Sequence, residues 1–125
     1  MWNKKPKLSE NFKKLRKISS DSPQPDIIQE AAAVIQSGGV VTYPTWCLYG
    51  LGADALNVSA LHRVFRIKQR PLSKPLLILV ASLNELPKWV IRIPQPAERI
   101  MNRFWPGGVT LVFHAGAALP GELTA

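Results

Sequence analysis

The chain has 125 residues, of which 46% are hydrophobic, and it carries a net charge of +8. This length corresponds to one domain with one core, and the apolar content excludes wholesale disorder. No apolar run approaches the roughly 20 residues of a membrane-spanning helix, so we expect no membrane span. Cys47 is the single cysteine, and Cys and His are too few for a four-ligand zinc site. We therefore expect no metal ligands and a reducing, cytoplasmic setting.

The positive charge is concentrated in two segments. Residues 1–20 carry seven Lys and Arg against one Glu, and residues 63–74 carry five cations and no acid. We interpret residues 1–24 as a basic flexible leader and residues 25–125 as the folded part. Lysines near a polyanion release counterions, so the leader is compatible with nucleic-acid contact. A solvated tail explains the same composition, and both interpretations stay open.

The first predicted element is a helix that Asp26 caps and that Gly38-Gly39 ends in a left-handed turn. An apolar stripe runs along it, formed by Ile27 or Ile28, Ala31, Ala32 and Ile35. The β-branched run 40–43 then predicts a strand, which ends at Pro44 because proline has no N–H to donate. Residues 45–52 are predicted to form a loop.

A second helix is predicted to begin at Asn57 or Ser59 and to end at residue 69 or 70, before Pro71. The continuously apolar segment 76–81 predicts a strand covered on both faces. Ser82 and Glu85 have the spacing of a capping box and predict a short helix. A further helix is expected over 96–104 and a third strand over 109–113. Strands alternating with helices favour an α/β fold with helices on a mixed or parallel sheet. Three strands would leave this sheet thin, as in the front portion of a larger domain.

Two segments offer groups that can bind a ligand. The loop after the first strand contains the Thr45 hydroxyl, and Gly50 and Gly52 there permit close backbone approach or positive φ. Lys68 is spaced i+7, i+4 and i+3 from Leu61, Val64 and Phe65, which places it on the buried stripe. Pro71 could turn Arg70 towards Lys68, and the pair would then clamp a polyphosphate. Alternatively, both cations stabilise the helix C-terminus. Cys47, His62 and His114 have no partner at catalytic or metal-binding spacing.

Several segments together resemble the YrdC family of threonylcarbamoyl-AMP synthases. They are Gly38 to Thr45, Tyr49 to Gly52, Ile67 to Pro71, Lys74 to Leu76, and Phe104 to Gly107 with Leu111. The resemblance runs from about residue 27 to 124. It implies a YrdC-like α/β fold, a twisted mixed sheet flanked by helices around a basic concave cavity, and incomplete here relative to the full domain.

The resemblance also implies an activity, which is a nucleotidyl transfer that joins L-threonine, bicarbonate and ATP into threonylcarbamoyl-AMP and releases pyrophosphate. The product serves the formation of N6-threonylcarbamoyladenosine in tRNA. ATP would act as a substrate with Mg²⁺ on its phosphates. Lys68 and Arg70 would be catalytic, and the substrate-binding residues would be Thr45, Lys68, Arg70, Lys74 and Thr110.

Two departures from the family pattern bear on activity. Trp46 and Cys47 follow Thr45 where family members have an acidic and then a small residue, which would alter selectivity or entry to the cavity. The family's Ser-x-Asn motif lies further along than Ala125, so a chain of this extent is expected to lack part of the nucleotide site and to be inactive alone. Two alternatives stay open. One is a non-catalytic module that binds double-stranded RNA or tRNA, and the other is a carbamoyl-transfer domain like those of hydrogenase maturation factors.

Overall fold

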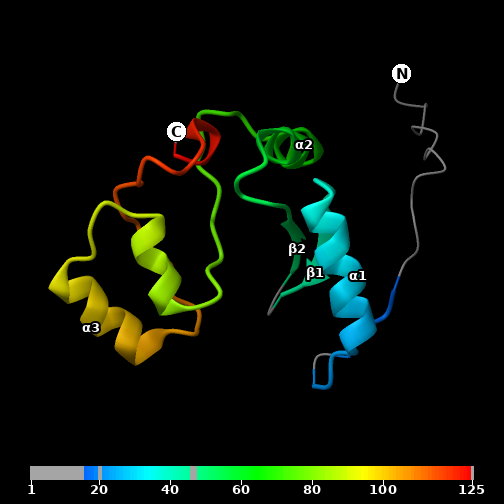
Figure 1. The fold of residues 1–125 in the computed structure, drawn as a ribbon, viewed down its shortest axis with the longest axis horizontal. Helices are drawn as coiled ribbons and strands as arrows, with labels where there is room; N and C mark the ends of the chain where they lie inside the picture. The colour runs from blue at the N-terminus through cyan, green and yellow to red at the C-terminus, as the bar shows by residue number, and fades with distance from the viewer. Residues whose placement is uncertain (1–15, 20, 46–47, 125) are drawn as a thin grey trace.

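The computed structural model describes residues 16–19, 21–45 and 48–124. The elements in chain order are α1 (Pro25–Gln36), β1 (Val41–Pro44), β2 (Tyr49–Gly52), α2 (Val58–Lys68), the 3-10 helix η1 (Leu83–Lys88), α3 (Gln95–Phe104) and the 3-10 helix η2 (Gly121–Leu123). In Figure 1, α1 lies beside the hairpin of β1 and β2, whereas η1 and α3 lie on the other side of the molecule. Within the described ranges, no helix is long and apolar enough to cross a membrane.

The core is centred on α2. Seven hydrophobic side chains are buried, and four of them belong to this helix: Ala60, Leu61, Val64 and Phe65. The other three come from later segments, namely Leu86 in η1, Met101 in α3 and Leu123 in η2. The buried face of α2 follows the i, i+3, i+4 spacing of its sequence, which confirms this predicted helix.

Helix α1 forms as predicted, although its first turn differs. Pro25 occupies the first turn after Gln24, so Asp26 lies inside the helix and is not its cap. The left-handed residue after the helix is Gly38, with a φ of 78°. A Cβ there would lie 2.9 Å from Nδ2 of Asn57, so glycine is required by both conformation and space. From the predicted leader, Arg16 Nε donates to Glu30 of α1 at 2.9 Å, whereas residues 1–15 and 20 lie outside the described residues.

The predicted loop over residues 45–52 is wrong in its second half, because residues 49–52 form β2. This strand pairs antiparallel with β1, with Val41 opposite Gly52 and Pro44 opposite Tyr49. Gly50 and Gly52 lie under the ring of Tyr43, since an added Cβ would approach this ring to 2.9 and 3.0 Å respectively. The two glycines therefore make room for an aromatic ring, and neither adopts a positive φ.

The strands predicted over 76–81 and 109–113 are not formed as paired strands in the described part of the chain, whose one sheet contains β1 and β2. Both segments nevertheless alternate residue by residue between half-buried and exposed side chains. The second segment leads into an isolated antiparallel bridge between Val90 and Ala115. Strand-like alternation is thus present without the hydrogen-bonded neighbour that defines a strand.

The capping box predicted at Ser82 does not form. Glu85 N–H bonds to the backbone carbonyl of Ser82 at 3.2 Å, and the Ser82 side chain makes no capping bond. The resulting element is the 3-10 helix η1, which contains Pro87. The helix predicted over 96–104 is confirmed as α3, and it ends where Trp105 donates through Nε1 to the carbonyl of Val109 at 2.7 Å.

Candidate phosphate-binding site

The C-terminal end of α2 positions the predicted catalytic cations. Gln69 takes a left-handed conformation with a φ of 49°, and its N–H bonds to the carbonyl of Arg66 at 3.2 Å. The N–H of Arg70 bonds to the carbonyl of Phe65 at 3.0 Å. This pair of bonds is a Schellman motif, which satisfies the last carbonyls of the helix and reverses the chain between Lys68 and Arg70. The sequence analysis attributed the end of this helix to Pro71. In the structure, the left-handed residue that ends the helix is Gln69.

Arg70 closes the turn that follows the helix. Its guanidinium donates from Nη2 to the carbonyl of Pro75 at 2.9 Å, and Nε approaches the carbonyl of Lys74 at 3.5 Å. The N–H of Lys74 bonds back to the carbonyl of Pro71 at 3.1 Å. Because a guanidinium carries five N–H donors, the fork keeps further donors for a ligand. We call residues 68–75 the basic turn.

Lys68 is exposed, so its predicted place on the buried stripe is wrong. The stripe ends at Phe65 because α2 ends three residues later and no described segment packs over Lys68. Among the described residues, neither Lys68 nor Lys74 has an ion pair. Since residues 63–74 contain no acid, the positive field of the basic turn is not neutralised locally. An exposed cluster of cations around a guanidinium fork suits a phosphate group.

Thr45 lies at the turn of the hairpin. Its hydroxyl donates to the carbonyl of Leu48 at 2.6 Å, and its N–H bonds to the same carbonyl at 2.8 Å. Thr45 follows β1 directly, so its hydroxyl lies at the closed end of the hairpin, beside the pair of Pro44 and Tyr49. Among the described residues, no hydrogen bond joins Thr45 to the basic turn. Trp46 and Cys47, the two departures from the family pattern, lie outside the described residues.

Thr110 is exposed and lies in the alternating segment 109–114. No hydrogen bond connects its side chain to the basic turn or to Thr45 within the described ranges. Lys68, Arg70 and Lys74 therefore share one turn, whereas no hydrogen bond within the described ranges joins Thr45 or Thr110 to it. The substrate-binding roles of these two threonines stay predictions.

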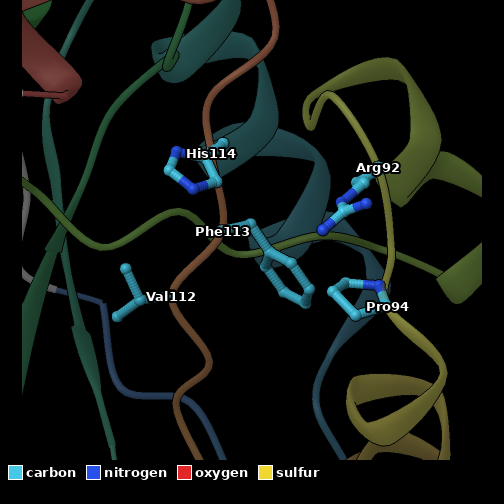
Figure 2. Close-up of a pocket in the computed structure, with 5 residues that line it drawn as sticks. All are labelled: Arg92, Pro94, Val112, Phe113 and His114. Carbon is cyan, nitrogen blue, oxygen red and sulfur yellow. The ribbon is translucent and has the colours of Figure 1, made fainter.

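A hollow of about 340 Å³ has none of the predicted site residues in its lining. It is lined by Arg92, Pro94, Val112, Phe113 and His114. In Figure 2, Arg92 and the Phe113 ring lie on one side of the 109–114 segment, and Val112 and His114 point to the other side. The hollow therefore straddles a strand-like segment and does not converge on one ligand. Sequence reasoning missed this hollow, because the bridge between Val90 and Ala115, which joins the two segments that line it, leaves no local pattern.

Arg63 is a second cation that sequence reasoning did not assign. Its Nη1 donates to the carbonyl of Gly38 at 3.0 Å, which ties α2 to the turn after α1. This bond spans 25 residues, so no local pattern indicates it. Arg63 therefore has a structural partner, in contrast to Lys68 on the same helix.

The basic turn has the donor set of an anion site. It offers ammonium and guanidinium N–H groups and no carboxylate, so it suits phosphates and not a directly bound cation. Among the described residues, no group of three or more His, Cys, Asp or Glu side chains could hold a metal ion.

Comparison with known proteins identifies the family of this chain. The family model Sua5/YciO/YrdC, described as telomere recombination, matches residues 33–125. The chain belongs to this family, and its fold is the incomplete α/β YrdC-like arrangement. The threonylcarbamoyl-AMP synthase of Pyrococcus abyssi (strain GE5 / Orsay) is 42% identical over 97 residues, which are 78% of this chain and 28% of that protein.

Two solved structures resemble the fold. P. abyssi Sua5 complexed with L-threonine has a TM-score of 0.79 at 40% identity, over 82% of this chain and 30% of that one. E. coli YciO has a TM-score of 0.72 at 29% identity, over 82% of this chain and 49% of that one. The chain spans between about a quarter and a half of the length of the curated relatives it matches.

Proposed function

We propose that this chain acts in threonylcarbamoyl-AMP synthesis and that the basic turn binds the phosphates of ATP. The observation that carries the proposal is the turn itself, in which Arg70 holds the carbonyls of residues 74 and 75 while Lys68 and Lys74 remain exposed. The family membership supplies the reaction, because relatives at 42% and 38% identity are named threonylcarbamoyl-AMP synthase.

The proposed chemistry uses fixed positive charge. When the carboxylated amino group of threonine attacks the α-phosphate of ATP, negative charge builds up on the phosphates and pyrophosphate leaves. Lys68 and Arg70 would stabilise this charge, Lys68 as a point charge and Arg70 as a fork. The left-handed turn fixes the backbone between them, and the carbonyls of residues 74 and 75 also hold the Arg70 guanidinium in place. Bicarbonate would supply the carbamoyl carbon.

Mg²⁺ would reach the site on the nucleotide, since the donor set of the basic turn suits phosphates. Threonine is proposed as the amino-acid substrate because a related structure is complexed with L-threonine. Thr45 and Thr110 would contact the substrates. We place the reaction in the cytoplasm, which agrees with the single cysteine and with a role in tRNA modification.

A second candidate function is RNA binding without chemistry. The net charge of +8 and the acid-free segment 63–74 favour it, because cations that contact phosphates without neutralising partners gain affinity from counterion release. Such binding would weaken steeply with salt and after removal of residues 1–20. It would change little in Lys68→Ala or Arg70→Ala, each of which removes one charge of many.

The test measures MgATP binding and pyrophosphate release by the 125-residue chain, with and without L-threonine and bicarbonate. We expect Lys68→Ala and Arg70→Ala each to weaken MgATP binding by about tenfold or more, as loss of a charge-assisted contact does. Arg66→Ala is the matched control, because it removes an exposed charge from the same helix. Equal affinities in all three variants would contradict the phosphate site. Threonine-dependent release would show that these 125 residues suffice for the reaction, whereas binding without release would make them a nucleotide-binding part of the synthase site.

A further inference from the structure

Gln69 has an unusual backbone conformation at the centre of the basic turn. Among the described residues it is the one residue other than glycine with a positive φ, which is 49°. This left-handed conformation costs free energy for any residue that carries a Cβ, and helix ends that need it usually have glycine or asparagine there. Gln69 also lies directly between Lys68 and Arg70, the two cations proposed to bind phosphates.

Nothing in the free chain offsets the cost of this conformation. Asparagine and aspartate tolerate a positive φ because their short side chains can bond to the nearby backbone. The side chain of Gln69 is exposed, and within the described ranges its amide makes no hydrogen bond. A glycine would form the same turn without the cost. Strained residues of this kind are found where function uses them, which directs attention to the side chain itself.

The backbone at the centre of the turn has no free donor for a ligand. The N–H of Gln69 bonds to the carbonyl of Arg66 at 3.2 Å, and the N–H of Arg70 bonds to the carbonyl of Phe65 at 3.0 Å. Turns that contain a left-handed residue can bind anions through such N–H groups. Here the end of α2 uses both of them. A phosphate at the centre of this turn must therefore be bound by side chains.

The side chains at the centre differ in what they offer a phosphate. Lys68 is a point charge, which attracts an anion without fixing its orientation. Arg70 already donates from Nη2 to the carbonyl of Pro75, and its Nε approaches the carbonyl of Lys74. Gln69 brings a neutral amide whose two N–H donors have no acceptor in the described part of the chain. A neutral donor between two cations adds a directional bond without adding repulsion between like charges.

We propose that the side-chain amide of Gln69 donates from Nε2 to a phosphate oxygen of the nucleotide bound at the basic turn. This bond offsets, in the complex, the cost of the left-handed backbone. Gln69 is then a third ligand-binding residue of the turn, and it exchanges stability of the free chain for affinity. The inference rests on the proposed function, because it requires that the basic turn binds the phosphates of ATP.

The experiment measures binding of MgATP and of magnesium tripolyphosphate to the 125-residue chain by calorimetric titration. Gln69→Gly removes the side chain and its backbone cost. Gln69→Ala removes the amide but keeps a Cβ at the same φ, so it separates loss of the amide from relaxation of the turn. We expect both variants to bind both ligands about tenfold more weakly, as loss of a hydrogen bond to a charged group does. Urea denaturation should show Gln69→Gly to be more stable than the unsubstituted chain and Gln69→Ala to be unchanged.

Two further measurements make the test specific. Gln36→Ala is the matched control, because Gln36 is an exposed glutamine at the last residue of α1, and this variant should keep both affinities. The side-chain NH₂ resonances of Gln69, assigned by their loss in Gln69→Ala, should shift saturably with MgATP and with tripolyphosphate. The NH₂ resonances of Gln36 should not shift.

Three results would overturn the inference. One is an unchanged affinity of Gln69→Ala. A second is a loss of affinity in Gln69→Gly alone, which would assign the effect to the geometry of the turn. A third is a loss for MgATP with tripolyphosphate binding unchanged, which would place the amide on the nucleoside.

The variant Lys68→Ala distinguishes this failure from failure of the proposed function. If Lys68→Ala weakens MgATP binding and Gln69→Ala does not, the phosphate site stands and only the role of Gln69 is wrong. If neither variant changes the affinity, or if the unsubstituted chain binds no MgATP, both the phosphate site and the role of Gln69 are wrong.

Discussion

Arg70 donates an N–H from Nη2 to the carbonyl oxygen of Pro75 at 2.9 Å, and this bond folds the chain back after α2. Lys74 lies between the two residues that this bond joins. Lys68 is the last residue of α2, just before the chain reverses at Gln69. Arg70 therefore both supplies a positive charge and fixes the turn that presents two others. The guanidinium geometry matters for the second task, because a lysine cannot span two carbonyls in one plane.

Arg70→Lys is expected to keep the charge and lose the turn. Without the fork, the carbonyls of residues 74 and 75 lose their shared donor, so amides 71–75 should exchange faster. MgATP affinity should fall by about tenfold. Lys68→Arg is the control, since it keeps the charge at a position with no described carbonyl partner. Calorimetric titration and amide exchange check both effects; an Arg70→Lys variant with wild-type affinity would show that charge alone suffices.

Gln69→Gly is expected to stabilise the chain. Gln69 is a residue other than glycine at a φ of 49°, where a side chain costs about 1 kcal/mol. Glycine removes this cost, and we expect the free energy of unfolding to rise by up to about 1 kcal/mol. Arg66→Gly, three residues earlier within α2, should lower it by about 1 kcal/mol. Urea denaturation measures both, and destabilisation by Gln69→Gly would refute the left-handed turn.

Gly38→Ala is expected to destabilise the fold by about 1–2 kcal/mol, because alanine would adopt a left-handed φ of 78°. Its Cβ would also lie 2.9 Å from Nδ2 of Asn57, which caps α2 by accepting from Ala60 N–H at 3.0 Å. Gly108→Ala provides the comparison, since nothing lies within 4 Å of a Cβ there. Thermal unfolding should distinguish the two, and equal midpoints would be evidence against this geometry.

Arg63→Ala is expected to lower the free energy of unfolding by about 1 kcal/mol, as loss of one hydrogen bond typically does. The bond from its Nη1 to the carbonyl of Gly38 at 3.0 Å connects α2 with the end of α1. Arg66→Ala should have an effect within about 0.5 kcal/mol, because Arg66 is exposed on the same helix. Chemical denaturation of both variants checks the difference; a larger effect of Arg66→Ala would contradict the assignment.

The helices were predictable because their signals are local. The i, i+3, i+4 spacing of Leu61, Val64 and Phe65 and the cap at Asn57 lie within the element that they define. Strand β2 was missed because Gly50 and Gly52 have low strand propensity, and their use under the Tyr43 ring depends on a neighbouring strand. The segments 76–81 and 109–113 were predicted to be strands from their apolar patterns. They are not paired in the described part of the chain, because a local pattern does not specify a neighbouring strand.

The sequence could predict the candidate site only for those residues that are close together along the chain. Lys68, Arg70 and Lys74 share one turn, so their short spacing already placed them together. The exposure of Lys68 was not predictable from its periodicity, because a helical stripe carries no information on what packs over its last turn. Contacts between distant segments, such as Arg63 with Gly38 and Val90 with Ala115, leave no local signature.

The most direct measurement follows the side-chain Nε–H resonance of Arg70 in the nitrogen-15-labelled chain during titration with MgATP. Binding of the phosphates at the basic turn predicts a saturable shift of this resonance that Lys68→Ala weakens. The Nε–H resonance of Arg63 should not shift, because the guanidinium of Arg63 already donates to the carbonyl of Gly38. Saturation by MgATP with the Arg70 resonance unmoved would contradict phosphate binding at this turn.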